Sequence, residues 1–412
     1  MPDEIVSAPC SKSDGMRPDL APPDTLLPVT LLDVSRLVWR RWAGRLPTGI
    51  DRVCLAYLDR FGGHARAVLQ WRGHVRVLSP RQSARLFDLI AHGGPGFRRQ
   101  FVAMLPAIAV GALGAGARDL AGARYFNVGH TGLDQPALPR WIIARRLRAV
   151  FVLHDLIPIT HPALCRAGGA RRHERRIRHA LTAGAAIIAN SAATLAELDA
   201  FATAHALPLP PRLPAWIGGV AAHAPALHQP PVRPWFVTVG TIEGRKNHLM
   251  LLQVWQRLAQ IFGPATPLLI VAGQRGWEAG AALAIIDRDP ALAAHVVEIG
   301  GADDATLAGL IAGARALLMP SFAEGFGLPV IEALQLGTPV IASNLPVFRE
   351  IGAGIPMLID PIDAPAWLAA VCAFRTDGPD RARQIAAMAQ YRAPTWDDHF
   401  ARVGPWLDQI LP

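Results

Sequence analysis

The stretch PSFAEGFGLPVIEAL (320–334) decides how this chain folds. An apolar run before it predicts a buried strand that ends at Ser321, and a helix follows from about Leu328. The intervening loop, Glu324 to Gly327, contains two glycines, which let backbone N–H groups approach an anion closely. Pro329 costs no hydrogen bond near the first helical position. The stretch therefore predicts an α/β unit with an anion site at the helix N-terminus.

Strand and helix alternate on both sides of this stretch. Predicted strands occupy 234–240, 267–273, 295–301, 315–321 and 338–344, and predicted helices occupy 246–262, 277–289, 304–314 and 328–337. Continuous apolar strands separated by helices are typical of buried parallel sheets. Open α/β sheets bind ligands at the carboxyl ends of their strands, so chemistry is expected in the turns that follow these strands.

The first half of the chain shows the same alternation less regularly. Predicted strands occupy 28–38, 65–71, 74–79, 123–129, 149–156 and 185–191, and helices begin within 46–61 and fill 166–184. Between the halves, 205–234 holds eight prolines over thirty residues, a density that excludes a regular helix or a central strand. The fold class predicted is α/β, with two doubly wound Rossmann-like domains facing a cleft. Their boundaries are 28–215 and 216–390, after a disordered tail at 1–27 and before a terminal helix at 391–412.

Composition narrows the class of protein. At 412 residues the chain is long enough for two domains, and 51% hydrophobic residues with only 18% charged residues exclude disorder of the whole. Lys and Arg number 41 against 32 Asp and Glu, a net charge of +9 carried mostly by arginine, which grips phosphates with a planar fork. Nucleotides, anionic lipid surfaces and nucleic acid all remain candidate partners at this point. The four cysteines (Cys10, Cys54, Cys165, Cys372) lie far apart and favour a reducing compartment.

A second segment also points to a phosphate ligand. FVTVGTIEGRKNHLMLLQVW (236–255) predicts a strand, a turn at Gly240 and Thr241, and Arg245 with Lys246 at the start of a helix. Two cations beside a helix N-terminus form a diphosphate site and can stabilise a leaving phosphate as negative charge develops. The alternative is a solvated pair on the surface, which the order of this segment before 320–334 disfavours.

These two segments resemble the family-4 retaining glycosyltransferases, which have the GT-B fold. Glu324 and Glu332 match the E-x7-E signature, and 236–255 is similar to the family's G-x-x-x-x-R-K-N segment, with Gly244 where relatives have Pro and a looser loop expected. The resemblance implies that Glu324 contacts the donor sugar, that Glu332 binds the ribose, and that Arg245 and Lys246 hold the donor phosphates. The remaining expected donor-site residues are Gly240, Thr241, Ser321, Gly325, Phe326, Gly327 and Leu328.

The acceptor side is expected in the first half. PTGIDRV (47–53) resembles the family's first glycine turn at Gly49, with an ordinary turn as the alternative. VLHDLIPITHP (152–162) is similar to a loop in which His154 lies near the donor sugar and acceptor, and it places Asp155 beside it. His130 follows another predicted strand. A buried structural histidine is the alternative for both His130 and His154. The last segment, 392–411, resembles the family's terminal helix, which crosses back to the first domain.

Two features suggest a surface that meets a membrane. The apolar run 101–117 contains Pro106 and is at the short limit for a membrane span, so a buried or surface-docked helix is the better interpretation. The predicted helix 166–184 contains six arginines: Arg166, Arg171, Arg172, Arg175, Arg176 and Arg178. They form either a solvated surface or a site for anionic head groups or a lipid-diphosphate acceptor.

The sequence therefore predicts a retaining, metal-independent hexosyltransferase of surface polysaccharide synthesis. GDP-mannose is favoured over UDP-glucose as donor, the acceptor is a saccharide or lipid-linked saccharide, and neither a cofactor nor nucleic acid is expected. No Asp-x-Asp metal motif stands at a predicted strand end. The expected location is cytoplasmic, peripheral on the inner face of the membrane. The alternatives are a nucleotide-sugar epimerase of the same architecture and a basic membrane- or nucleic-acid-binding protein without catalysis.

Overall fold

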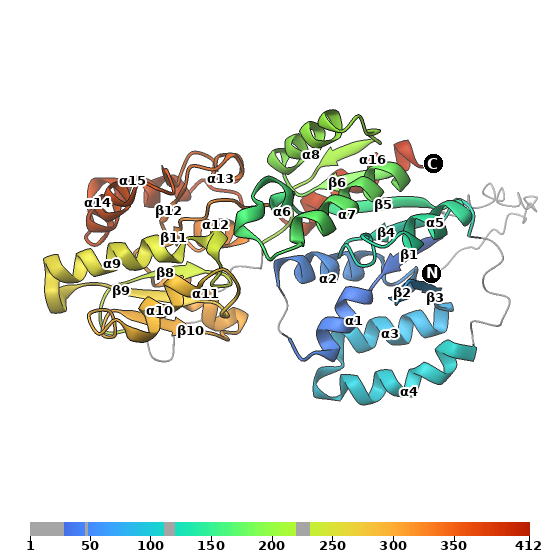
Figure 1. Cartoon of the computed structure of the whole chain (residues 1–412), viewed down its shortest axis with the longest axis horizontal. Coiled ribbons are helices and arrows are strands. Elements are labelled where there is room, and N and C mark those ends of the chain that lie inside the picture. Colours follow the sequence, from blue (N-terminus) through green and yellow to red (C-terminus); the bar gives the residue numbers. More distant parts are fainter. Residues whose placement is uncertain (1–28, 46–47, 111–119, 220–230) are drawn as a thin grey trace, which may run out of the picture.

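The computed structural model describes residues 29–45, 48–110, 120–219 and 231–412, and it contains two α/β domains side by side (Figure 1). The first domain is built on a seven-stranded sheet of order β3-β2-β1-β4-β5-β6-β7, and the second on a six-stranded sheet of order β10-β9-β8-β11-β12-β13. In each sheet the strand order reverses beside the first strand, which creates a switch point where ligands bind. The prediction of two doubly wound α/β sheets is confirmed. The predicted tail, 1–27, lies outside the described residues.

The first sheet is parallel except at one edge. Its strands are β1 (Thr30–Asp33), β2 (Ala65–Trp71), β3 (His74–Val77), β4 (Arg124–Asn127), β5 (Arg148–Leu153), β6 (Ala186–Ala189) and β7 (Arg212–Pro214). The predicted strands 65–71 and 74–79 are present as β2 and β3, and β3 pairs antiparallel with β2. Arg72 and Gly73 between these strands both have positive φ, the backbone of a tight hairpin turn, so no crossover helix is needed there.

The first helix of this domain begins inside a segment predicted as a strand. They are α1 (Ser35–Trp42), α2 (Gly49–Phe61), α3 (Pro80–His92), η1 (Gly94–Gly96), α4 (Phe97–Val110), α5 (Ala137–Ala144), α6 (Ile157–Thr160), η2 (Pro162–Leu164), α7 (Gly169–Ala183) and α8 (Ala192–Ala204). The predicted strand 28–38 is wrong beyond Asp33. The carboxylate of Asp33 accepts the Ser35 N–H at 3.0 Å, a local turn that ends the strand and allows α1 to start.

The second sheet is parallel throughout its described strands. These are β8 (Trp235–Val239), β9 (Leu268–Ala272), β10 (Val296–Ile299), β11 (Leu317–Met319), β12 (Val340–Ser343) and β13 (Met357–Ile359). The helices are η3 (Gly244–Lys246), α9 (His248–Phe262), η4 (Gly263–Ala265), α10 (Gly280–Arg288), α11 (Asp304–Ala312), α12 (Leu328–Gln335), α13 (Pro346–Ile351), α14 (Ala364–Phe374), α15 (Pro379–Met388) and α16 (Trp396–Ile410).

The chain crosses between the domains twice, at the proline-rich segment and before α16. Within the proline-rich segment, β7 forms the edge of the first sheet, and 220–230 lies outside the described residues. The last helix, α16, packs on the first domain, where the Tyr57 hydroxyl lies 2.9 Å from Nε2 of His399. Arg124 pairs with Asp408 of the same helix at 2.7 Å. The C-terminal helix α16 is thereby attached to the first domain.

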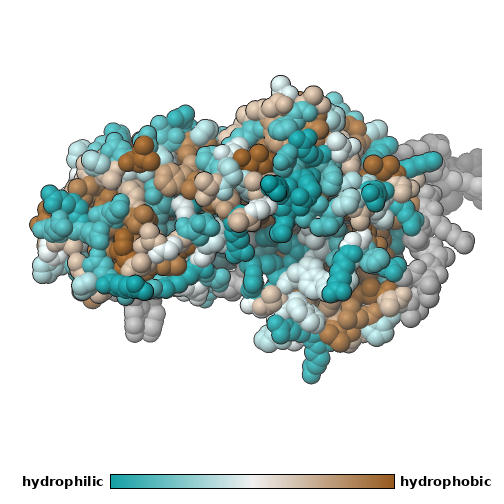
Figure 2. Space-filling view, in the orientation of Figure 1, coloured by the Kyte–Doolittle hydropathy of each residue, from teal (hydrophilic) through white to brown (hydrophobic). Residues whose placement is uncertain are grey.

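Residues 101–110 of the apolar run lie in α4, and its residues 111–117 lie outside the described part. Phe101 and Met104 are buried, whereas Val102 and Leu105 are 47% and 43% exposed. Apolar side chains gather over α4, at the lower right of the space-filling view (Figure 2). Among the described helices, none has the length and apolar character needed to cross a membrane. The structure of α4 therefore agrees with a surface-docked helix that leaves an apolar stripe uncovered.

Candidate donor site at the carboxyl ends of the second sheet

The two segments singled out by sequence lie next to each other because their strands are neighbours. β8 pairs with β11 in parallel, so the turns that follow both strands open at the same edge of the sheet. The Phe322 N–H donates to the carbonyl of Arg245 at 2.9 Å, and the Asn247 amide donates to the carbonyl of Pro320 at 3.2 Å. These bonds attach the Arg-Lys turn directly to the loop that carries Glu324.

Arg245, Lys246 and Glu324 form one compact ionic cluster. Nζ of Lys246 lies 2.6 Å from one oxygen of Glu324, and a terminal nitrogen of Arg245 lies 2.9 Å from the other. The Ser321 hydroxyl donates to Glu324 at 2.7 Å, and Glu243 pairs with Arg245 at 2.6 Å. The side chains of Arg245, Lys246 and Glu324 are only 18%, 12% and 8% exposed. Two of the predicted phosphate ligands and the predicted sugar ligand therefore converge within a single contact network.

The electrostatics of the cluster are set by burial and by the charges within it. Burial alone would raise the pKa of Glu324, but Arg245 and Lys246 outweigh it and hold that pKa at about 2. Burial lowers the pKa of Lys246, and Glu324 offsets only part of the effect. For Arg245, burial is outweighed by Glu324 and Glu243, and its pKa is raised. Glu324 is consequently ionised at neutral pH and available to accept hydrogen bonds.

Close packing explains the glycines of these turns. A Cβ at Gly325 would lie 2.2 Å from the carbonyl oxygen of His154 in the other domain, a distance that no real side chain tolerates. The expectation of a looser loop at Gly244 is wrong. Gly244 begins the ordered turn η3, and a Cβ there would lie 2.7 Å from the carbonyl oxygen of Glu278. Glycine replaces the family's proline here because the backbone of another loop presses against it.

The first domain holds the Glu324–Gly327 loop from the opposite side of the cleft. The hydroxyls of Ser191 and Thr194, at the start of α8, donate to the Gly325 carbonyl at 3.1 and 3.2 Å. Phe326 is buried in the cluster of apolar side chains that is continuous between the domains. These contacts hold the loop against the first domain, and α12 starts from it at the contact between the domains.

Glu332, expected to bind the ribose, lies one turn into α12 and contacts the other domain. Arg52 of α2 donates to Glu332 at 3.0 Å, and its second terminal nitrogen pairs with Asp304. Burial raises the pKa of Glu332, and Arg52 opposes this effect. Arg52 stands inside the quoted segment 47–53, but sequence inspection assigned it no role because its partner is 280 residues away.

The two expected acceptor-side histidines are buried. His130 bonds to the end of β5, and His154 bonds to the residue that follows β4. Nε2 of His130 lies 2.8 Å from the carbonyl of Val152, and Nε2 of His154 lies 2.7 Å from the carbonyl of Val128. Because a carbonyl only accepts, both rings carry their proton on Nε2. The ring centroids are 5.0 Å apart, and burial lowers the pKa of both, so both are neutral at pH 7.

Both histidines therefore tie the end of β4 to the end of β5. His173 of α7 makes the same type of bond, donating from Nε2 to the Asp155 carbonyl at 2.9 Å. The Asp155 carboxylate accepts the N–H of Ile157 at 3.1 Å and so supports the start of α6. Among the described residues, no partner is found for Nδ1 of His130, His154 or His173.

Gly49 is the first residue of α2 rather than part of a loop before it. The nearest atom to a Cβ at this position belongs to Leu328, at 3.7 Å, so the N-termini of α2 and α12 meet across the cleft. Beside them, the buried Asp51 pairs with Arg36 at 2.6 Å and with Arg40 at 2.9 Å. These two arginines place positive charge at the end of β1, a feature that the sequence pattern did not indicate.

The six arginines around α7 do not act as one surface. Arg166 stacks on Trp277 of the second domain with its guanidinium carbon 4.2 Å from the ring centroid. Arg176 is mostly buried and faces Asp134 at 3.7 Å, and Arg178 pairs with Glu174 at 2.8 Å. The six arginines therefore do not form one uniform patch, and lipid contact by the exposed ones stays a prediction. Four of the six are exposed: Arg166, Arg171, Arg172 and Arg175.

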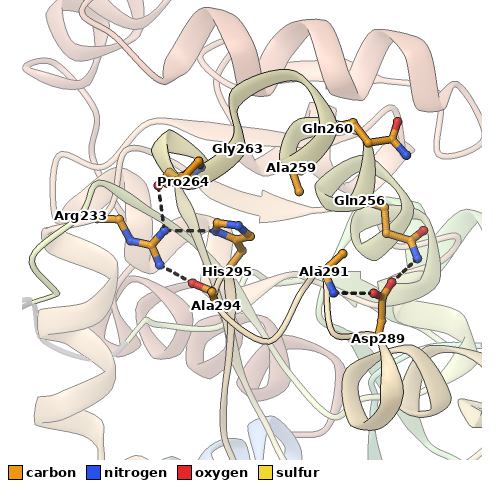
Figure 3. Close-up of a pocket in the computed structure, with 10 residues that line it drawn as sticks. All are labelled: Arg233, Gln256, Ala259, Gln260, Gly263, Pro264, Asp289, Ala291, Ala294 and His295. Carbon is orange, nitrogen blue, oxygen red and sulfur yellow. Dashed lines mark hydrogen bonds between the residues drawn. The ribbon is translucent and has the colours of Figure 1, made fainter.

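A separate open cavity of about 910 Å³ lies at the opposite, amino-terminal end of the second sheet. Figure 3 shows Arg233 reaching across it to the carbonyl of Pro264, at 3.3 Å, and to Nδ1 of His295, at 3.1 Å. Gln256 and Asp289 bond to each other on the far wall at 2.6 Å. These polar groups satisfy one another, and the cavity is remote from every predicted site residue.

No cluster of three or more His, Cys, Asp or Glu side chains placed to hold a metal ion occurs within the described ranges. The described cysteines, Cys54, Cys165 and Cys372, are free thiols.

Comparison with known proteins gives a consistent result for the second domain. Residues 233–377 match the family of glycosyl transferases group 1. O-antigen chain mannosyltransferase B of Escherichia coli is 35% identical over 163 residues, which cover 39% of this chain and 42% of that protein. The serotype-specific mannosyltransferase WbdA of Escherichia coli is 40% identical over 118 residues, 29% of this chain and 14% of that protein. The alignments thus span less than half the length of these curated relatives.

The fold of the whole chain is also found among solved structures. HepE of Anabaena, in complex with UDP and glucose, superposes with a TM-score of 0.60 at 13% identity, covering 88% of this chain and 97% of HepE. At that identity the likeness concerns the fold. The family match and this superposition agree with each other: residues 233–377 are similar to the glycosyl transferases group 1 family, and the chain has the GT-B fold.

Proposed function

We propose that this protein is a glycosyltransferase that moves a hexose from a nucleotide-diphosphate sugar to a saccharide or lipid-linked saccharide in surface polysaccharide synthesis. The observation that carries the proposal is the cluster of Arg245, Lys246 and Glu324 at the N-terminus of α12. Among the described residues, no protein acceptor is found for the backbone N–H groups of 325–327. Cations and free N–H groups at one helix start suit a diphosphate.

Mannose is the proposed sugar and GDP-mannose the proposed donor. The support is that the curated relatives are named as O-antigen chain and serotype-specific mannosyltransferases, and that residues 233–377 contain the matched domain. UDP-glucose is the second candidate, because HepE has the same fold and was solved with UDP and glucose. Both donors present the same diphosphate to Arg245 and Lys246.

In the proposed mechanism the diphosphate takes over the two cations that pair with Glu324 in this structure. Arg245 and Lys246 then neutralise the negative charge that develops on the leaving nucleoside diphosphate. Glu324, freed from part of its ion pairing, accepts hydrogen bonds from hydroxyls of the transferred hexose. The acceptor hydroxyl attacks the sugar on the face from which the diphosphate leaves, so the anomeric configuration is retained. No metal or cofactor takes part in this scheme.

The first domain is proposed to supply the acceptor side. His154 lies against the Gly325 loop through its carbonyl, and a neutral imidazole with a free Nδ1 can accept a hydrogen bond from a sugar hydroxyl. Asp155 and His130 hold this region in place through the main-chain bonds described above. Gly49 keeps the cleft open to substrate beside Leu328.

We also propose a peripheral contact with the anionic inner face of the cytoplasmic membrane through α4. The exposed Val102 and Leu105 lie on the same helix as Arg98 and Arg99, which supports combined apolar and electrostatic attraction. The protein should co-sediment with vesicles rich in anionic lipid, and less of it should do so in high salt. The double substitution V102D/L105D should abolish this co-sedimentation. Equal sedimentation with neutral vesicles would contradict the electrostatic part.

The catalytic proposal is tested first by thermal-shift measurements with GDP, UDP and ADP, since a bound nucleotide stabilises the folded state by mass action. Transfer from labelled GDP-mannose and UDP-glucose is then compared for the wild type, for K246M and for R257Q, which is the surface control. Arg257 is exposed on α9, and its side chain donates to Gln260 of the same helix. K246M should lose transfer while R257Q keeps it. Equal transfer by K246M and the wild type would overturn the site.

A further inference from the structure

Arg52 is the residue by which the first domain reaches the predicted nucleoside site. It lies in the first turn of α2, whose N-terminus meets that of α12 at the Gly49–Leu328 contact. Its guanidinium spans two carboxylates of the second domain, Glu332 at 3.0 Å and Asp304 on its other terminal nitrogen. The side chain of Arg52 is 23% exposed and that of Glu332 is 11% exposed.

The charge balance at this point makes Arg52 indispensable to Glu332. Among the described residues, Arg52 is the hydrogen-bond partner found for the Glu332 carboxylate. Burial raises the pKa of Glu332, and Asp304 raises it further, whereas Arg52 acts in the opposite direction. Without Arg52, two carboxylates would face each other beside a site that must accept an anionic nucleotide. Leaving one such group buried and unpaired is costly.

The contact leaves room for a ligand. Arg52 bonds to Oε1 of Glu332, and no protein donor to Oε2 is found within the described part of the chain. Each carboxylate oxygen accepts more than one hydrogen bond, so a pair of vicinal hydroxyls can bind Glu332 while Arg52 stays in place. Arg52 is therefore arranged to support a diol ligand and not to be displaced by it.

We propose that Arg52 is a positioning residue of the donor site, which orients Glu332 toward the ribose hydroxyls and ties nucleotide affinity to closure of the two domains. The inference rests on the proposed function, in which Glu332 takes the ribose. It assigns to the first domain a part in donor binding, in addition to its part in acceptor binding. Arg52 acts through Glu332 and does not touch the reacting atoms.

The test measures binding of GDP and of 2′,3′-dideoxy-GDP by calorimetry to the wild type and to R52Q. R52Q should bind GDP about tenfold more weakly, the size expected for a lost charge-assisted hydrogen bond. Its affinity for the dideoxy nucleotide should stay within about twofold of the wild-type value, because that ligand makes no ribose contact for Arg52 to support. The control is R60Q, two turns further along α2, where Arg60 is exposed and should change neither affinity.

Three further readouts separate positioning from a general structural effect. R52K should recover part of the GDP affinity, because it restores one donor and the charge. Arg52 lowers the pKa of Glu332, so in R52Q this carboxyl should become protonated at a higher pH. The loss of GDP affinity on acidification should therefore begin at a higher pH in R52Q than in the wild type. E332Q and R52Q should be non-additive toward GDP. Equal losses for both nucleotides, or no loss for GDP, would overturn the inference. Failure of the proposed function would differ, because the wild type would then bind none of GDP, UDP and ADP.

Discussion

Replacing Glu324 by Gln should destabilise the empty protein and abolish transfer, yet make the protein respond more strongly to a nucleoside diphosphate. The carboxylate is 8% exposed and lies between Lys246 at 2.6 Å and Arg245 at 2.9 Å. Its pKa is held at about 2 instead of 4.5. One pKa unit corresponds to ~1.4 kcal/mol, so the ionised carboxylate contributes about 3 kcal/mol at neutral pH. Removing one partner of a buried pair has a cost of similar size.

The pH dependence has a definite sign. The pKa of Glu324 is lower in the folded state than its ordinary value of 4.5, so the stabilisation is complete above that value. It is lost as the pH falls from 4.5 toward 2, where the folded carboxylate also becomes protonated. E324Q should lack this part of the acid transition. Between pH 6 and 8 its melting temperature should lie several degrees below that of the wild type.

A nucleoside diphosphate should reverse most of the loss in E324Q. Its phosphates supply the negative charge that Arg245 and Lys246 have lost, so ligand-induced stabilisation should be greater in E324Q than in the wild type. Differential scanning fluorimetry with and without GDP measures both effects, and a labelled-donor assay measures transfer. Glu278→Gln is the matched control, since Glu278 is exposed in the neighbouring loop. A smaller GDP shift in E324Q than in the wild type would refute the reasoning, as would normal transfer.

Other perturbations test the packing around the site. Gly325→Ala should push the domains apart, because its Cβ would lie 2.2 Å from the His154 carbonyl oxygen. Transfer should then fall at least tenfold while the circular dichroism spectrum stays unchanged. Normal transfer kinetics would contradict the close approach. His248 is buried with both ring nitrogens unpaired among the described residues, and burial lowers its pKa to about 4. His248→Leu should therefore lose less stability than the wild type when the pH falls from 6.5 to 4 in urea titrations. Tyr57→Phe removes the bond to His399 and should reduce the free energy of unfolding by about 1 kcal/mol, with an unchanged urea midpoint as the contrary result.

Some features of the donor site were predictable because they are local. The Glu324–Gly327 loop, Pro329 and the Arg245-Lys246 pair are recognised from a few neighbouring residues, since strand ends, glycine turns and helix starts depend on local backbone preferences. The alternation of strands and helices in the second half was predicted for the same reason. The pattern failed at Ser35, where a bond to the Asp33 side chain ends the predicted strand, and it did not specify that β3 pairs antiparallel with β2.

By itself, the sequence determined that two cations and two acids stand at strand ends of a parallel α/β domain. Only the tertiary structure decided what each of them touches. Glu324 meets Lys246 from 78 residues away because β8 and β11 are neighbours in the sheet, and Glu332 meets Arg52 from 280 residues away because the domains close. His130 and His154 each bond to the strand end beside the other. Backbone propensities act over a few residues, whereas such pairings arise from strand order and domain contact, which no local pattern encodes.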